Sequence, residues 1–504
     1  FLTFLLGIPL ILVTLIWPHK KSISLLSFII FSTFLILIFI DYSVFRLYRF
    51  HLNGMVWNMI TGGAITEILV LDSGNMLSLT FFMLTFFIFQ WAIVKFIFHP
   101  HKKLNWLKGG SVLVLILVIQ FCGQSLYAWA DAWYKPDVLA QIRYIPLPQP
   151  LTIKRFLRKK GWAPENQQND DIKLSSKGRF QYPKKTLECV QSEEKLNILL
   201  IISDSLRFDM LQPDIMPNSS LLASQSQQFT HHISTGNATR FGIYGLLSGL
   251  YGHYWFDALN TQAPSVLIEQ LRSQGYRLGL FPNARLTNPE FDKALFSSIL
   301  DKIPQSTPGK TVIDRDYEIT RQAIDFIKQP SDQPFFGLVF MDAPHAYVYP
   351  PEDEVFTPAL KTINYLELNN QSNPDTFLNR YKNAIHFNDR LTGKILDTLK
   401  KQHLMENTIV ILTGDHGQEA NETQTNSWGH NSNFSKYQVQ VPFILYWPGR
   451  DPTEYKHLTS HTDLVPTLMQ NVLGCNNPSS DYSNGVSLFD KSEKAFVLVN
   501  NWTN

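Results

Sequence analysis

Cysteine is scarce in this sequence, with 3 residues among 504, and charged residues make up only 17% of the chain. Three cysteines are too few for a disulfide scaffold, so that class of small secreted domain is excluded. The net charge is +2 and no basic run carries interleaved aromatic residues, so nothing predicts nucleic-acid binding. Cys189 and Cys475 pair if their segment faces an oxidising compartment, and otherwise remain two free thiols.

Charge is most depleted in the first third of the chain. Four apolar stretches there are candidate membrane helices, and they cover residues 1–17, 22–40, 81–98 and 111–129. A spanning helix needs about 20 residues, so the middle two fit and the first is short. We therefore expect a transmembrane region over 1–134, with one further helix missing at the N-terminus and a truncated C-terminus.

Clustered basic residues predict how the membrane region is oriented. They occupy the loops 19–21 and 99–103, which the positive-inside rule assigns to the cytoplasm. The segment after residue 134 then lies outside. The sequence thus predicts a multi-pass inner-membrane protein whose C-terminal domain is periplasmic.

A linker is expected over 135–194. Its proline-rich part, 145–150, favours extended chain, and Thr152 suits the cap of a short helix over 153–160. That helix carries Lys154 and Arg155 beside aromatic residues, a composition that suits anionic lipid headgroups. A merely solvated basic linker is the alternative.

From residue 195 to 504, apolar runs alternate with amphipathic patterns, which predicts an α/β domain with a mostly parallel sheet between helices. The expected strands are 197–203, 277–281, 335–341, 408–413 and 442–447, and the expected helices are 264–273, 315–328, 375–401 and 463–473.

Polar residues follow two of these strands directly. Asp204 ends one apolar run, and Asp415 with His416 ends another. The carboxyl ends of parallel strands are where open α/β sheets bind ligands, and a mixed carboxylate and imidazole set suits a divalent metal. Thr239 lies where a glycine-containing loop meets an apolar helical stretch. A metal would make its hydroxyl a nucleophile, whereas an isolated threonine there is an ordinary helix cap.

Other histidines give weaker signals. His345 follows a strand and is expected to orient a substrate phosphate, and His430 is expected to protonate a leaving group. His461 and Asp463 open a helix and fit capping roles, and no pattern supports a role for His232.

These residues resemble the alkaline phosphatase/sulfatase superfamily, particularly its phosphoethanolamine transferases and lipoteichoic-acid synthases. The resemblance implies that Asp204, Thr239, Asp415 and His416 hold one divalent metal ion, Zn²⁺ or Mn²⁺ with Mg²⁺ as an alternative, and that Thr239 is the nucleophile. The sulfatase signature Cys/Ser-x-Pro-x-Arg is absent, which favours phosphoryl over sulfate-ester chemistry.

The whole chain resembles the YejM/PbgA inner-membrane proteins. The matching stretches include 40–46, 129–132, 155–157, 235–237 and 461–464. This resemblance implies five membrane helices, a link to lipopolysaccharide homeostasis, and lipid A binding by Thr152, Lys154 and Arg155. Enterobacterial members lack the Asp-His pair that this chain keeps at Asp415 and His416.

Two functions follow. The first is a metal-dependent hydrolase or phosphotransferase that acts on phosphate-bearing lipid or envelope headgroups. The second is a sensor of lipid A or cardiolipin with a relict site, which regulates lipopolysaccharide through an inner-membrane protein partner.

Overall fold

The computed structural model divides into two compact units, Phe1–Ser175 and Ser176–Asn504, which are described separately. The structure describes residues 2–17, 19–48, 51–52, 73–97, 106–133, 135–139, 141, 144–145, 150–162, 180–190, 195–365, 367–491 and 494–501. The expected basic loop at 99–103 and most of the proline-rich segment lie outside these residues.

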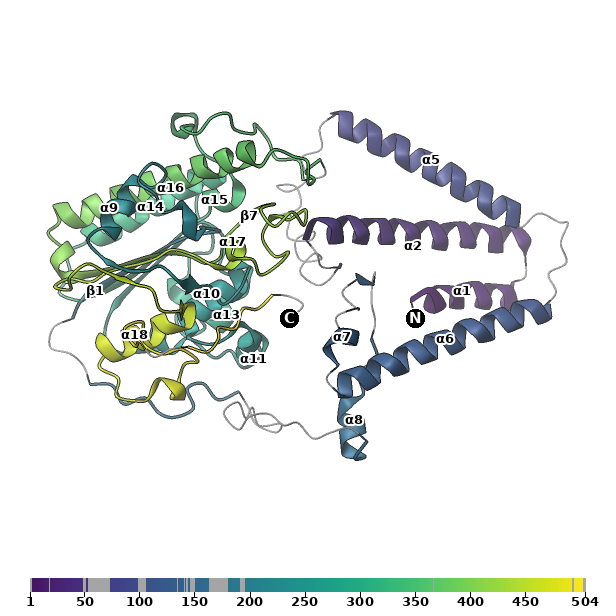
Figure 1. Ribbon diagram of the computed structural model, residues 1–504, viewed down its shortest axis with the longest axis horizontal. Helices are drawn as coiled ribbons and strands as arrows, with labels where there is room; N and C mark the ends of the chain where they lie inside the picture. The colour runs from purple at the N-terminus through teal and green to yellow at the C-terminus, as the bar shows by residue number, and fades with distance from the viewer. Residues whose placement is uncertain are drawn as a thin grey trace. The chain divides into compact units, whose positions relative to one another are not determined.

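Long helices form the first unit, one at each predicted apolar stretch. They are α1 (Leu2–Ile16), α2 (Lys20–Tyr48), α5 (Ser73–Ile97) and α6 (Trp106–Ala132) (Figure 1). By length and composition, the segments Lys20–Phe45, Thr80–Ile97 and Val114–Ala132 are able to cross a membrane. Helix α1 has 15 residues, fewer than the roughly 20 that a span requires.

The chain after α6 is fastened back to that helix by polar contacts. It contains α7 (Pro136–Leu139) and α8 (Lys154–Lys159), the short helix predicted at 153–160. The backbone N–H of Leu151 donates to Gln124 Oε1 at 2.7 Å, and Lys154 Nζ lies 3.2 Å from Asp131 Oδ1. Gly161 ends this part with a φ of +72°, a conformation that glycine adopts without steric cost.

A seven-stranded sheet forms the centre of the second unit, in the order β10-β2-β9-β6-β1-β5-β4. Strand β1 pairs in parallel with β5 and β6, β4 pairs in parallel with β5, and β9 is antiparallel to β6. The strands are β1 (Asn197–Ser203), β2 (Gln227–Phe229), β4 (Arg277–Pro282), β5 (Phe335–Met341), β6 (Thr408–Gly414), β9 (Phe443–Tyr446) and β10 (Thr453–Tyr455). All five predicted strands are confirmed.

Helices cover both faces of this sheet, as predicted (Figure 1). In β1, Ile198, Leu200 and Ile202 pack into one hydrophobic core, while Leu199 and Ile201 pack into the other. This alternation explains why the strand is apolar throughout. One core is completed by α10 (Thr239–Ser248), α12 (Val266–Ser273) and α18 (Leu464–Asn471), the other by α9 (Pro217–Ala223), α14 (Val312–Lys328) and α16 (Pro374–Lys401).

Side-chain caps set where the longer helices begin. Thr311 and Asp314 form a capping box, so α14 starts three residues before the predicted 315. Asn373 caps α16, and Pro374 occupies its first turn, where its missing N–H costs nothing.

The second unit also includes a segment that the sequence assigned to the linker. Residues 180–190, called the strap below, lie against the globular body before β1 begins. Phe180, Tyr182 and Leu187 pack on its core, and the Tyr182 hydroxyl donates to Ser248 O at 2.5 Å. Burial of these apolar side chains explains why residues 180–190 pack with the second unit, which begins at Ser176.

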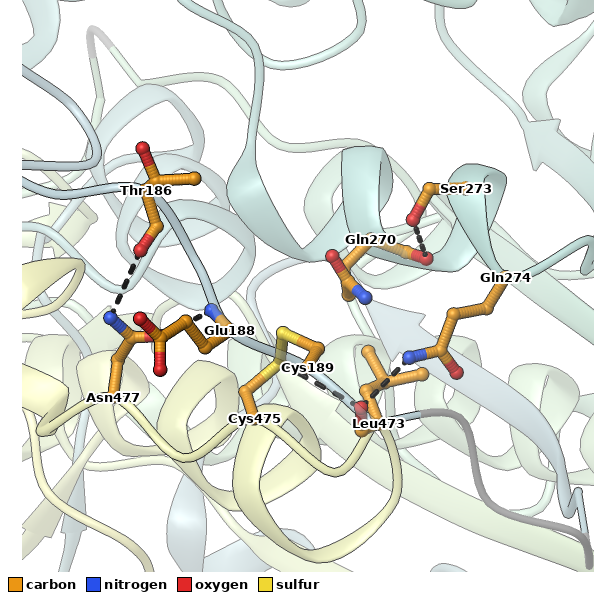
Figure 2. The surroundings of a disulfide bond; sticks show 9 residues. All are labelled: Thr186, Glu188, Cys189, Gln270, Ser273, Gln274, Leu473, Cys475 and Asn477. Atoms are coloured by element: carbon orange, nitrogen blue, oxygen red, sulfur yellow. Dashed lines mark hydrogen bonds between the residues drawn. A yellow bond between two sulfur atoms is a disulfide. The ribbon is translucent and has the colours of Figure 1, made fainter.

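A disulfide fixes the strap to the end of the domain. Cys189 and Cys475 are bonded across 286 residues of sequence. Figure 2 shows the bond between flanking backbone contacts, in which Glu188 N–H donates to Asn477 Oδ1 at 2.6 Å and Asn477 Nδ2 donates to Thr186 O at 3.1 Å. Of the two states left open by the sequence, the paired one is present.

Candidate metal centre

Two neighbouring strands bring the acidic residues together. Ser203 of β1 pairs with Gly414 of β6 in the parallel register. The next residue on each strand, Asp204 and Asp415, therefore lies at the same edge of the sheet. Both carboxylates are buried, with 5% and 0% of their surface exposed, as is the adjoining His416. The predicted strand-end cluster of Asp204, Asp415 and His416 is thus assembled.

Thr239 joins this cluster from another element, since it is the first residue of α10. Its Oγ1 lies 3.3 Å from Asp204 Oδ2, to which it donates, and 3.4 Å from His416 Nε2. The N-cap position of α10 is occupied by Ala238, so Thr239 lies one residue inside the helix. The hydroxyl therefore faces the carboxylate and imidazole groups and does not serve as a helix cap.

Hydrogen bonding fixes which nitrogen of His416 is free. Nδ1 of His416 lies 2.8 Å from the carbonyl oxygen of Gly417. A carbonyl oxygen can only accept a hydrogen bond, so Nδ1 carries the hydrogen and donates it. The lone pair is then on Nε2, which lies 3.5 Å from Asp415 Oδ2 and 3.7 Å from Asp204 Oδ1. Histidines that bind metal ions typically donate their other ring N–H to a backbone carbonyl or carboxylate in this way, which fixes the orientation of the ring.

The two oxygens of the Asp415 carboxylate differ in their surroundings. Asp415 Oδ1 accepts from the backbone N–H groups of Ser205 and His416, both at 2.9 Å. Asp415 Oδ2 is buried and has no hydrogen-bond partner among the described residues. Such an atom is costly unless a cation meets it. Together with the free Nε2 of His416, it means that the residues present fit a divalent metal.

Electrostatics agree with this interpretation. Burial raises the pKa of Asp415 to about 6. Burial first and the charge of Asp415 second raise the pKa of Asp204. Burial lowers the pKa of His416, which keeps its imidazole neutral and able to ligate.

The two additional predicted histidines also lie at this site. The His430 ring centroid is 4.4 Å from that of His416 and 5.2 Å from that of His345. His430 Nδ1 is 2.8 Å from Gln418 Oε1, and burial lowers the pKa of His430. Desolvation opposes a charge on His345, but the carboxylates of Asp204 and Asp342 outweigh it and raise its pKa.

Asp342 is a residue of this region that the sequence reasoning did not single out. Its carboxylate, that of Asp204 and the His345 ring form a second group whose ligand atoms lie within 4.8 Å of one another. Buried Asp316 holds this segment by accepting from the N–H groups of Asp342 and Ala343. Asp342 directly follows β5, so its strand-end position was the available signal.

Three other residues lie next to the metal cluster. The sequence indicated no role for His232 or Ser234, and it predicted a capping role for His461, whose side chain instead contacts the Asp415 carbonyl. His232, Ser234 and His461 are buried, and Ser234 Oγ and His461 Nε2 both approach the backbone carbonyl of Asp415. Asp463 makes the predicted cap, in a capping box with Ser460. His232 and His461 contact each other through ring nitrogens 3.0 Å apart, although they are distant in the sequence. This distance explains why no sequence pattern revealed the contact.

The predicted lipid-binding residues lie in the first unit. Thr152 is exposed, and Lys154 is paired with Asp131. The side chain of Arg155 lies outside the described part of the chain. Phe156 and Trp162, which follow Lys154 in the chain, have 52% and 64% of their surface exposed.

Two protein-family models match the chain, one over most of each unit. The model of the Sulfatase family matches residues 196–474, and that of a domain of unknown function, DUF3413, matches residues 1–189. The chain belongs to the sulfatase family. Together the two domains give the arrangement of the YejM/PbgA inner-membrane proteins.

Several relatives cover nearly the whole chain, and two of them show the range of similarity. An uncharacterised protein of Haemophilus influenzae is 30% identical over 484 residues, which are 94% of this chain and 74% of the relative. Inner membrane protein YejM of Salmonella typhimurium is 27% identical over 94% of this chain and 76% of its own length. Among solved structures, the C-terminal periplasmic domain of EcEptC from Escherichia coli has a TM-score of 0.48 at 14% identity, covering 61% of this chain and 90% of that one.

Proposed function

We propose that the globular unit is a metal-dependent hydrolase or phosphotransferase for phosphate-bearing headgroups of membrane or envelope lipids. The observation that carries the proposal is Thr239 Oγ1, which lies within 3.3 Å of Asp204 Oδ2 and 3.4 Å of His416 Nε2. The disulfide supports an oxidising compartment, and so a periplasmic site.

One divalent ion, Zn²⁺ or Mn²⁺ with Mg²⁺ as a further candidate, would be held by Asp204, Thr239, Asp415 and His416. When bound, such an ion lowers the pKa of a coordinated hydroxyl and stabilises negative charge on phosphoryl oxygens. Two observations support these four ligands. His416 Nε2 carries no proton and has a lone pair to offer, and Asp415 Oδ2 has no hydrogen-bond partner among the described residues.

The residues themselves would carry the bond changes. Thr239 Oγ attacks phosphorus while its proton passes to Asp204 Oδ2, its hydrogen-bond acceptor. A bond from phosphorus to Oγ forms, and the bond to the leaving oxygen breaks. We assign orientation of the phosphate to His345 and protonation of the leaving oxygen to His430. Burial lowers the pKa of His430, and the negative charge of a phosphate beside its ring would raise that pKa and let the ring carry the proton. Water, or an acceptor hydroxyl in a transferase, then takes the phosphoryl group from Thr239.

The side chain of the nucleophile favours phosphate over sulfate esters. Formylglycine arises from cysteine or serine, whose β-carbon can become an aldehyde. Position 239 is threonine, whose β-carbon carries a methyl group. The aldehyde chemistry of classical sulfatases is therefore not open to this site.

Replacing Thr239 with alanine tests the nucleophile. We expect Thr239→Ala to lower p-nitrophenyl phosphate turnover more than about 10³-fold, with the folding midpoint unchanged. Thr261→Ala, which removes an exposed hydroxyl at the end of α11 (Trp255–Thr261), is the matched control. Turnover retained by Thr239→Ala would contradict the assignment.

A second candidate function rests on the basic helix. We propose that Thr152, Lys154 and Arg155 bind the phosphates of lipid A, cardiolipin or another phospholipid, and that the chain then regulates lipopolysaccharide through an inner-membrane partner. The exposed Phe156 and Trp162, whose rings lie 6.3 Å apart, favour insertion at a headgroup surface. Because Asp131 already pairs with Lys154, a lipid phosphate would have to displace that carboxylate.

Vesicle binding tests the second function. Lys154→Ala with Arg155→Ala should weaken binding to cardiolipin or lipid A vesicles, since each cation near an anionic surface contributes about 1 kcal/mol. Lys456→Ala with Lys491→Ala removes two exposed cations of the globular unit and is the control. Unchanged binding and unchanged lipopolysaccharide levels in the first variant would eliminate the sensor hypothesis.

A further inference from the structure

Behind the metal cluster lies a pair of buried histidines that the proposed chemistry does not use. His232 belongs to β3 (His232–Ile233), which pairs in parallel with β11 (Thr459–Ser460), and His461 follows β11 directly. Both side chains are 0% exposed. Burying two imidazoles without solvent is tolerated when their nitrogens are hydrogen-bonded, so their bonds need a full account.

The hydrogen bonds of this pair can run in one direction only. His461 Nε2 lies 3.2 Å from the carbonyl oxygen of Asp415, which cannot donate, so Nε2 carries the proton. His461 Nδ1 must then accept, and it lies 3.0 Å from His232 Nε2, which donates. His232 Nδ1 accepts in turn from Thr459 Oγ1 at 3.0 Å. Burial lowers the pKa of both rings, in agreement with two neutral tautomers.

The series of hydrogen bonds from Thr459 through His232 and His461 ends at the backbone carbonyl oxygen of Asp415. The Asp415 carbonyl also accepts from Ser234 Oγ, in the loop that leads to Thr239. Helix α10 approaches the same atom closely, since a β-carbon added to Gly242 would lie 2.1 Å from it. The carbonyl therefore accepts hydrogen bonds from His461, directly after β11, and from Ser234 in the loop before Thr239, and α10 packs against it at Gly242.

We propose that His232 and His461 are positioning residues of the metal centre, which hold the Asp415–His416 peptide so that both side chains face the ion. The inference rests on the proposed metal site and extends it to two residues that would not touch the ion or the substrate. A fixed peptide matters because Asp415 and His416 are consecutive, and rotation of the peptide plane between them would turn both ligands away.

Cation affinity of the full chain in detergent tests the proposal. We expect His461→Leu to weaken Mn²⁺ or Zn²⁺ binding by roughly 10–100-fold, the effect typical of lost outer-shell partners. His461→Gln should bind nearly as wild type, because its amide can place an N–H near the position of Nε2. His461→Asn, which is polar but too short, should bind as weakly as the leucine variant.

His457→Leu is the matched control. His457 is a half-buried histidine whose Nε2 lies 3.0 Å from Leu488 O and whose ring packs against Phe229, so its loss removes an imidazole and one hydrogen bond without touching the Asp415 carbonyl. If His461→Leu does not fold, the glutamine and asparagine variants still decide the question. Equal affinity in wild type, His461→Asn and His461→Leu would overturn the proposal while leaving the metal site itself intact.

Hydrogen exchange of the metal-free protein separates this inference from the proposed function. Faster exchange in the peptide covering 412–418 for His461→Asn, but not for His461→Gln, supports the positioning role even before an ion is added. If wild type binds no ion, the proposed function fails. If exchange in that peptide is also unchanged, the positioning role fails with it.

Discussion

At the residue scale, the contacts of Asp415 decide whether the site fits a metal ion. One oxygen accepts two backbone hydrogen bonds, the other has none among the described residues, and the backbone carbonyl is held from behind. Such an arrangement costs folding free energy in the metal-free protein, because a buried charge lacks full compensation. A bound cation would offset this cost.

This cost predicts a pH dependence. Burial raises the folded-state pKa of Asp415 from 3.8 to about 6, so the neutral acid is favoured in the folded protein. The stability associated with this group is complete below its unfolded pKa and is lost as the pH rises through about 6. The stabilising effect of added Mn²⁺ on the melting midpoint should therefore be larger at pH 8 than at pH 5. Asp415→Asn should reduce this difference without abolishing it, because burial also raises the pKa of Asp204. An effect independent of pH in wild type would contradict the prediction.

The sequence sufficed to predict Asp204, Asp415 and His416 because each ends a buried parallel strand, where side chains of adjacent strands converge. Thr239 needed the family resemblance as well. His232 and His461 were beyond sequence reasoning, since their contact depends on β3 and β11, which have two residues each. So short a strand has no detectable period.

At the scale of elements, the strap contacts the helix that carries Thr239. The Tyr182 hydroxyl donates to Ser248 O at the end of α10 and accepts from Val266 N–H at the start of α12. The disulfide lies seven residues further on, at Cys189. Any shift of the strap therefore bears directly on the helix of the nucleophile.

Removing the disulfide should destabilise the globular unit. The bond closes a loop of 286 residues, and a long loop gains most from cross-linking of the unfolded chain. We expect Cys189→Ser with Cys475→Ser to lower the free energy of unfolding by about 2–4 kcal/mol. In a denaturant titration followed by near-ultraviolet circular dichroism, the unfolding midpoint of this variant should move to a lower denaturant concentration.

Cys122→Ser, which removes the free cysteine, is the control for that comparison. In denatured wild type without reductant, only Cys122 should react with a thiol reagent. Two further reactive thiols, or an unchanged transition in the double variant, would contradict the role assigned to the bond.

Elements differed in how well the sequence predicted them. Long apolar runs such as 335–341 were located correctly, because both faces of a central strand are buried. Strands β2 and β10 were missed, since three residues between turns carry no distinct pattern. The strap was assigned to a linker because its composition is polar, although its few apolar side chains are packed on the body.

At the scale of the whole molecule, apolar helices precede a sulfatase-family domain that retains a complete candidate ligand set. Fold alone does not decide between enzyme and sensor, because one fold supports many functions. The deciding features are local: the assembled metal residues support catalysis, and the exposed aromatic and basic helix supports lipid binding. The two functions are compatible in one chain.

Metal content is the most direct test of the central claim. The full chain would be purified without immobilised-metal chromatography and analysed by mass spectrometry of its elements, beside Asp415→Ala with His416→Ala. The account predicts about one Zn²⁺ or Mn²⁺ per chain in wild type and almost none in the variant. A wild-type protein that contains no ion, and takes up none on titration, would contradict it.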